Sequence, residues 1–196
     1  EKDELKIIDF GISTELSREK QNIDTPKLLE GSLPYISPEQ TGRMNRHLDY
    51  RSDYYSLGAS LYHLLTGAAP FKADDVMGWL YCHIAEAPAE PCDLVPDIPP
   101  VISQIVLKLM AKNAEDRYQS SYGLIHDLKE CEKQWLNKGS IEDFELGQKD
   151  ISEQFQISQN LYGREKEIET LKNAFEGHSD GNVELAMVSG FSGVGK

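Results

Sequence analysis

The segment from Gly190 to Lys196 carries a pattern that can bind phosphate. It has the form G-x-x-x-x-G-K and follows the apolar run of residues 183–188. When a strand enters such a loop, the glycine backbone N–H groups can close around phosphate oxygens, and the lysine can reach the outer phosphates. We therefore predict a phosphate site at Gly190, Gly193, Gly195 and Lys196. The alternative is a glycine-rich hairpin with no ligand.

A second set of residues combines carboxylates with one distant arginine. Its members are Asp9, which ends an apolar run, Glu39, which ends the segment GSLPYISPE, Asp53, which precedes a long apolar stretch, and Arg117 in the sequence EDRY. Each is unspecific by itself. A lone acid near a helix start is explained by the helix dipole, and lone surface charges contribute little. The order and spacing of the four together are specific.

The stretch from Asp49 to Gly67 is the element expected to position these groups. At helical period Tyr54, Leu57 and Leu61 share a stripe, while other apolar residues of the stretch cover the remaining sides. A helix that is apolar nearly all round is a buried helix, so we predict burial on almost every side. Gly67 supplies the stop signal at its end.

The remaining elements follow from periodicity. We predict a short strand over 5–10, a helix over 74–86 with Val76, Leu80 and Ile84 on its buried stripe, and a proline-rich extended connector over 87–100. Further helices are predicted near 102–110 and from about 120 onward, the latter burying Leu124, Leu128, Cys131 and Trp135. His83 is expected to be a hydrogen-bonded or half-exposed helix histidine and not a metal ligand, because no second ligand lies at metal-binding spacing.

In this order and at these spacings, D-F-G at residues 9–11, a loop ending in Pro38-Glu39, D-x-x-x-x-G from Asp53 and the late Arg117 resemble the C-terminal lobe of a Ser/Thr protein kinase. The resemblance implies ATP and Mg²⁺ as cofactors and protein Ser/Thr side chains as substrates. It further implies that Asp9 is the Mg²⁺ ligand, with Phe10 and Gly11 shaping its turn.

The same resemblance assigns roles to the other residues. Gly31, Ser32, Pro38 and Glu39 belong to the substrate-docking loop; the family usually has Thr where Ser32 stands and Ala where Ser37 stands. Glu39 is expected to form a buried ion pair with Arg117. Asp53 is the core helix acid, which accepts hydrogen bonds from the backbone of the catalytic loop in kinases. Thr25 is a possible phosphorylation site, although an ordinary loop hydroxyl is the alternative.

Beyond residue 160 a second resemblance begins. The sequence Leu161-Tyr162-Gly163-Arg164-Glu165, the amphipathic helix predicted after it and the phosphate-binding pattern look like the opening of an AAA-type P-loop ATPase domain. Together with residues 37–46, they resemble large bacterial-type sensor proteins that join a Ser/Thr kinase, an ATPase, GAF and histidine kinase domains.

We therefore predict a mainly α chain with three parts. Residues 1–136 form a partial kinase C-lobe from D-F-G onward, residues 137–160 a linker, and residues 161–196 the first helix, strand and P-loop of an α/β NTPase domain. The alternatives to an active kinase are a pseudokinase scaffold and a regulatory ATPase with a kinase-fold docking domain. The chain contains only part of the kinase site and only part of the P-loop ATPase site. We therefore expect the isolated chain to be an inactive fragment of a longer protein.

Composition excludes some partners. The 196 residues carry a formal net charge of −13, which disfavours binding to nucleic acid or to an anionic membrane surface. No run approaches the roughly 18 apolar residues of a membrane span. Cys82, Cys92 and Cys131 lack disulfide or CxxC spacing, so a reducing, cytoplasmic location is predicted. The expected partners are a protein substrate and downstream signalling domains of the same polypeptide.

Overall fold

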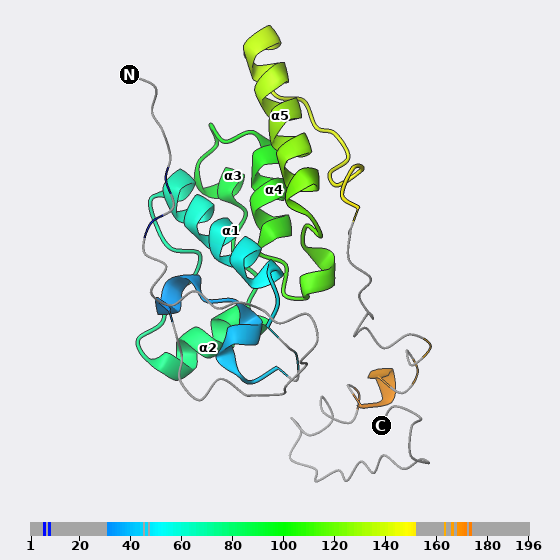
Figure 1. Ribbon diagram of the computed structural model, residues 1–196. Helices are drawn as coiled ribbons and strands as arrows, with labels where there is room; N and C mark the ends of the chain where they lie inside the picture. The colour runs from blue at the N-terminus through cyan, green and yellow to red at the C-terminus, as the bar shows by residue number, and fades with distance from the viewer. Residues whose placement is uncertain are drawn as a thin grey trace. The chain divides into compact units, whose positions relative to one another are not determined.

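The computed structural model describes residues 6, 8, 31–44, 46, 48–151, 163, 166, 168–171 and 173. The chain divides into two compact units, Glu1–Gln156 and Ile157–Lys196. The described part of the first unit is helical, as Figure 1 shows, and no strand occurs among the described residues. None of the helices described is long and apolar enough to cross a membrane.

The helical unit is built from long helices and short 3-10 turns. In chain order the elements are the 3-10 helices η1 (Leu33–Tyr35) and η2 (Pro38–Thr41), the helices α1 (Arg51–Thr66), α2 (Val76–Ala85), α3 (Pro91–Leu94) and α4 (Pro100–Leu109), the 3-10 helix η3 (Ala114–Asp116) and the helix α5 (Ser121–Lys138). Helices α4 and α5 run alongside each other, and α1 crosses beside α4 (Figure 1). This arrangement agrees with the mainly helical prediction.

Local sequence explains where these helices begin and end. Gly67 ends α1 in the left-handed conformation, with φ 76° and its N–H donating to the carbonyl of His63. Asp75 caps α2 by accepting from the N–H of Gly78 at 2.7 Å, and Ser120 caps α5 by accepting from the N–H of Gly123 at 3.0 Å. Such caps satisfy helix N–H groups that lack an intrahelical partner. The ends predicted from sequence agree with these bounds to within a few residues.

The core lies between α1, α2, α4 and α5, in two groups of buried side chains. The first group joins α1 to α2 and α4 through Tyr55, Ala59, Tyr62, Phe71, Cys82, Val106 and Met110. The second joins α4 to α5 through Val101, Ile105, Leu109, Tyr118, Leu124 and Cys131. Burial of this apolar surface is the main favourable contribution to folding of the unit.

The prediction that α1 is buried on almost every side is wrong for one face. Asp53, Leu57, Ser60 and Leu64 follow one another at helical spacing and are exposed, with Leu64 79% and Leu57 42% accessible. These values refer to the described residues, among which nothing covers this face. We call these four residues the outward face of α1, and the opposite, buried side the inward face.

Two other helical stripes need correction. On α2 the buried side carries Leu80 and His83, whereas Val76 is 48% exposed. On α5, Leu124 is buried as predicted, but Leu128 is 40% and Trp135 56% exposed. The helix periods were correct, and the error lies in how much of each stripe the neighbouring helices cover.

The proline-rich stretch 87–100 is not wholly extended. Pro91 begins the short helix α3, and Pro100 is the first residue of α4. Both prolines occupy the first helical turn, where a missing backbone N–H removes no hydrogen bond and the fixed φ favours the helix. Proline therefore starts helices here as well as separating them.

The described part of the predicted linker is attached to the helical unit. Ile141, Phe144 and Leu146 pack against the second core group. Asp150 accepts hydrogen bonds from the N–H of Gln119 at 2.7 Å and from the N–H of Ser120 at 2.8 Å. Among the described residues, the helical unit accordingly continues past α5 to Ile151.

Two predictions fall largely outside the described residues. Lys6 and Ile8 are the described members of the predicted strand at 5–10, and neither has strand conformation. In the second unit, residues 168–171 are helical, where the amphipathic helix was predicted. The predicted strand at 183–188 lies outside the described part of the chain.

Candidate functional site

The predicted docking loop, Gly31 to Glu39, is a turn-rich segment fixed against α1 and α2; we call it the docking segment. Gly31 has φ +107°, a conformation that favours glycine. Pro34 and Pro38 stand at the starts of η1 and η2, where their fixed φ suits a helical turn. The segment passes from exposed residues at Gly31 and Ser32 to fully buried ones near Glu39.

Glu39 and Arg117 form the predicted ion pair, and it is buried. The Arg117 Nη1 lies 2.6 Å from Glu39 Oε1 and Nη2 lies 2.8 Å from Oε2. Their side chains are 2% and 0% exposed. The Ser52 hydroxyl donates a further hydrogen bond to Oε1 at 2.7 Å. This bidentate geometry is the strong form of a charge-assisted hydrogen bond.

Arg117 also ties the pair to the surrounding backbone. Its remaining donors bond the carbonyls of Ala111 at 2.8 Å, Arg51 at 2.9 Å and Lys112 at 3.2 Å. Its guanidinium lies 5.1 Å from the centre of the Tyr55 ring. All five N–H groups of the guanidinium therefore have acceptors, which is the condition for burying this charge.

The environment of Glu39 keeps it ionised. Burial by itself raises the pKa of this carboxyl, but the hydrogen bonds and charge of Arg117, with the bond from Ser52, outweigh burial and hold the pKa below its usual value. The docking segment consequently ends on a fixed, fully satisfied carboxylate.

Asp53 and Ser32 lie in different surroundings from Glu39. The Asp53 carboxylate accepts no hydrogen bond from any residue that the structure describes, and partial removal from water raises its pKa. Ser32 is exposed at the start of the docking segment. The structure thus brings Glu39 and Arg117 together, and it does not bring Asp53 to either of them.

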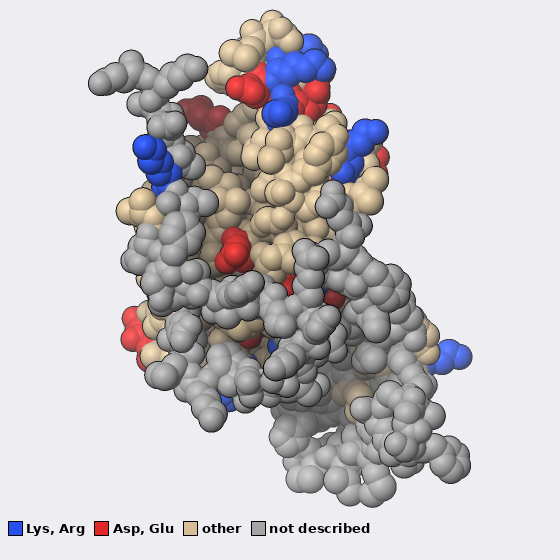
Figure 2. All heavy atoms as spheres, viewed as in Figure 1, with Lys and Arg blue, Asp and Glu red and all other residues tan. Residues whose placement is uncertain are grey.

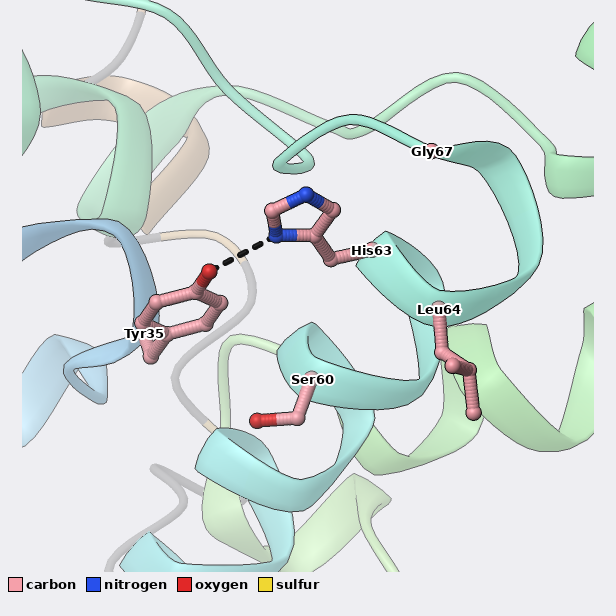
Figure 3. A pocket seen from close by; sticks show the side chains of 5 residues that line it. All are labelled: Tyr35, Ser60, His63, Leu64 and Gly67. Carbon is pink, nitrogen blue, oxygen red and sulfur yellow. Dashed lines mark hydrogen bonds between the residues drawn. The ribbon is translucent and has the colours of Figure 1, made fainter.

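A pocket of about 440 Å³ opens beside the docking segment, between that segment and the end of α1 (Figure 3). It is lined by Tyr35, Ser60, His63, Leu64 and Gly67. The Tyr35 hydroxyl and His63 Nδ1 share a hydrogen bond of 2.7 Å, and the two rings stack with their centres 6.1 Å apart. No carboxylate lines this pocket, so it offers the hydroxyls of Tyr35 and Ser60, the imidazole of His63 and ring surfaces.

Several predicted site residues lie outside the described residues. They are the metal ligand Asp9 with Phe10 and Gly11, the phosphorylation candidate Thr25, and the phosphate-binding residues Gly190, Gly193, Gly195 and Lys196. Within the described part of the chain, the one group with metal-ligand spacing is Glu90, Cys92 and Asp93, three residues at or near the surface around α3. Exposed acidic groups of this kind are common without a metal.

His83 is the site residue that sequence reasoning missed. It is fully buried on α2, and its Nε2 lies 2.7 Å from the carbonyl oxygen of Leu33 in the docking segment. Its Nδ1 lies 2.9 Å from the Tyr55 hydroxyl. A lone histidine beside an apolar stripe gives no sequence signal of these contacts, because its partners are 28 and 50 residues away.

The described surface around this site is unevenly charged. In the view of Figure 2 most of the described surface over α1 and α4 is neither acidic nor basic, and charged side chains gather over the far end of α5. On the outward face of α1, Asp53 is the one charged residue among four.

Comparison with known proteins shows which family this chain resembles. The family model described as protein kinase domain matches residues 1–129. The chain is 38% identical over 193 residues to the hybrid signal transduction histidine kinase G of Dictyostelium discoideum, covering 88% of this chain and 6% of that protein. It is 31% identical over 186 residues to the histidine protein kinase 1 of Candida albicans, covering 84% of this chain and 8% of that protein.

A shorter match joins the chain to a bacterial protein. It is 37% identical over 124 residues to the serine/threonine-protein kinase PknB of Mycolicibacterium smegmatis, covering 63% of this chain and 20% of that protein. The chain thus spans a fifth or less of the length of these relatives. The two matches to histidine kinases cover more of the chain than the kinase family model does.

Proposed function

This chain belongs to the protein kinase family, and from that membership we propose that it is the C-terminal lobe of a serine/threonine-protein kinase. The observation that carries the proposal is the docking segment, held on α1 by the buried Glu39–Arg117 pair with the exposed Ser32 at its free end. In this proposal the lobe binds a protein substrate, and the γ-phosphoryl group of ATP passes to a substrate Ser or Thr hydroxyl.

In the proposed reaction, different residues bind the metal ion and position the substrate. Phosphoryl transfer depends on positioning and on neutralising charge, since little covalent chemistry falls to the protein. Asp9 is proposed to hold Mg²⁺, which neutralises charge on the phosphates. Ser32 and the docking segment are proposed to orient the substrate backbone. The pocket lined by Tyr35 and His63 is well placed to take a neighbouring substrate side chain, and its lack of carboxylates favours a neutral or acidic one over a basic one.

We extend the proposal to the second unit. Its phosphate-binding pattern, ending at Lys196, supports the start of an ATP-binding regulatory module of AAA type. The matches to two proteins named as histidine kinases support a multidomain signalling protein, because they continue beyond the kinase family model. The free thiols of Cys82, Cys92 and Cys131 support a cytoplasmic location.

Substitution of Asp9 in the full-length protein tests the kinase proposal. We expect Asp9→Asn to abolish transfer of labelled phosphate from ATP to the protein itself and to casein, with the thermal unfolding midpoint unchanged. Asp97→Asn, which changes an exposed acid in the loop before α4, is the matched control and should retain full activity. Full activity in Asp9→Asn would refute the assignment, and an inactive wild-type protein would favour the pseudokinase scaffold.

A further inference from the structure

His83 is buried in a position where an imidazole needs two partners. Its relative exposure is 0%, and both ring nitrogens are within hydrogen-bond distance of other groups. Buried polar atoms without partners are destabilising, so these two bonds are the condition for placing a histidine here. The ring is polar on two edges and lies among the rings of Tyr55, Phe71 and Trp79.

The partners of His83 determine which nitrogen carries the proton. The Leu33 carbonyl can only accept, so Nε2 must donate to it across 2.7 Å. In the neutral ring Nδ1 then has a free lone pair, which accepts from the Tyr55 hydroxyl at 2.9 Å. One side chain on α2 therefore bonds both the docking segment and the inward face of α1.

Aromatic neighbours fix the orientation of the ring. The Tyr55 and Phe71 rings meet it edge to face, with centres 5.7 and 5.3 Å away, and the Trp79 ring stacks on it at 6.1 Å. Lys112 donates to the His83 carbonyl at 2.9 Å, which holds the backbone at the end of α2. Burial lowers the pKa of His83 to about 4, so the neutral ring persists at neutral pH.

Three side-chain contacts thus anchor the docking segment, one of which is the Tyr35–His63 hydrogen bond of 2.7 Å. The Glu39–Arg117 pair holds its end, and the His83 bond to Leu33 holds its first turn, next to Ser32. If the Glu39–Arg117 pair were the only anchor, the exposed start of the segment could move about its fixed end. The His83 bond, together with the Tyr35–His63 bond, removes that freedom at the point where substrate is proposed to bind.

We propose that His83 is a positioning residue for substrate binding, which sets the conformation of the docking segment through the carbonyl of Leu33. This inference rests on the proposed kinase function. It assigns to α2 a role in substrate affinity and leaves ATP binding and the chemical step to other residues.

The kinetic test compares three variants of the full-length protein. His83→Met removes both hydrogen bonds, His83→Gln keeps an amide N–H that can reach the Leu33 carbonyl, and Tyr81→Met is the control on the exposed side of the same helix. We expect His83→Met to raise KM for casein about tenfold, since one lost hydrogen bond is worth about one factor of ten. KM for ATP should stay within about twofold, and His83→Gln should recover most of the casein affinity.

A purely structural role for His83 would give a different result. Loss of folded protein would lower the apparent kcat and leave both KM values unchanged, and His83→Gln would then offer no selective rescue. Equal changes in both KM values, or no change in KM for casein, would overturn the proposal.

Hydrogen exchange separates failure of this inference from failure of the proposed function. The Tyr35 N–H donates to the Ser32 carbonyl at 2.9 Å within η1, so its protection reports the order of the docking segment. In His83→Met we expect faster exchange at residues 33–36 and unchanged exchange in α4 and α5. This outcome would support the anchor even in a protein without kinase activity. Unchanged exchange, or a uniform increase over the whole lobe, would refute it.

Discussion

The polar groups on the inward face of α1 have hydrogen-bond partners, whereas the carboxylate on its outward face has none among the described residues. On the inward face Ser52 bonds Glu39, and Tyr55 contacts both Arg117 and His83. On the outward face the carboxylate of Asp53 bonds no described residue, and Leu64 is 79% exposed. Both faces belong to one helix of nearly continuous apolar character.

The difference shows what allows a charge to stay buried beside an apolar helix. The pKa of Glu39 is lowered, because hydrogen bonds and the charge of Arg117 outweigh the effect of burial. The pKa of Asp53 is raised, because nothing in the described part of the chain offsets its partial loss of water. A charged residue beside α1 is therefore stabilised by the partner that the fold supplies to it.

Loss of Arg117 should have the largest effect on the inward face. Arg117→Ala leaves Glu39 buried and charged without its partner, so we expect the free energy of unfolding to fall by about 3–5 kcal/mol. Arg43→Ala is the matched control, since Arg43 is exposed, and should change stability by less than about 0.5 kcal/mol. Urea denaturation measures both. A loss under about 1 kcal/mol for Arg117→Ala would mean that the pair contributes no more to stability than a surface ion pair does.

Acid should weaken the inward face through His83. Burial lowers the pKa of His83 to about 4 from its ordinary 6.5, and the Lys112 cation nearby opposes protonation further. Between these values the unfolded chain binds a proton that the folded chain does not, so stability falls as the pH drops through this window. This pKa difference corresponds to a loss of stability of about 3 kcal/mol.

Denaturant titrations between about pH 6.5 and 4 check this sign and its source. In His83→Gln the decline over that window should become shallower, because the titrating ring is gone. Losses at still lower pH, where the carboxylates of pairs such as Glu39–Arg117 begin to bind protons, should be common to both proteins. Parallel curves for the variant and the wild type would show that other groups cause the pH dependence.

A single methyl group probes the packing of the inward face. A Cβ at Gly58 would lie 2.7 Å from Leu109 Cβ and 2.9 Å from Met110 Cγ. Overpacking of this kind is destabilising, and the better helix propensity of alanine offsets part of it, so Gly58→Ala should reduce stability by about 1–2 kcal/mol. Ser60→Ala on the outward face is the control. Equal effects of the two substitutions in thermal unfolding would remove the distinction between the faces.

The smallest effect on stability is expected at Asp53. Because its carboxylate bonds no described residue, Asp53→Asn should change the stability of this 196-residue chain by less than about 0.5 kcal/mol. In the full-length protein the same change should reduce phosphotransfer, if the backbone of a catalytic loop bonds this acid as the kinase resemblance implies. Equal destabilisation of both proteins would place its partners within these residues.

Contacts between residues of recognised motifs were predicted well from the sequence. Contacts that arise where separate elements cross were not. Glu39 and Arg117 are 78 residues apart, yet motif order identified them as partners. His83 was assigned an ordinary role, because its bonds to Tyr55 and Leu33 come from the crossing of three elements. Periodicity alone cannot reveal such a crossing.

The extent of burial was the second property that could not be predicted correctly from the sequence. The period placed Leu57, Leu128 and Trp135 on apolar stripes, but the described neighbours leave each of them exposed. A stripe gives the direction of a helix face, while its burial depends on the width of the element that packs on it. For the same reason the hydrogen bonds of Asp150 to the N–H groups of Gln119 and Ser120, which attach residues 139–151, could not be predicted from composition.

A double-mutant cycle on Glu39 and Arg117 tests most directly whether the inward face of α1 holds the docking segment through this pair. The free energy of unfolding is measured for the wild type, Glu39→Ala, Arg117→Ala and the double variant. We predict a coupling energy of about 2–3 kcal/mol, because removing the second partner relieves the charge left buried by removing the first. Additive single losses, within about 0.5 kcal/mol, would contradict the account.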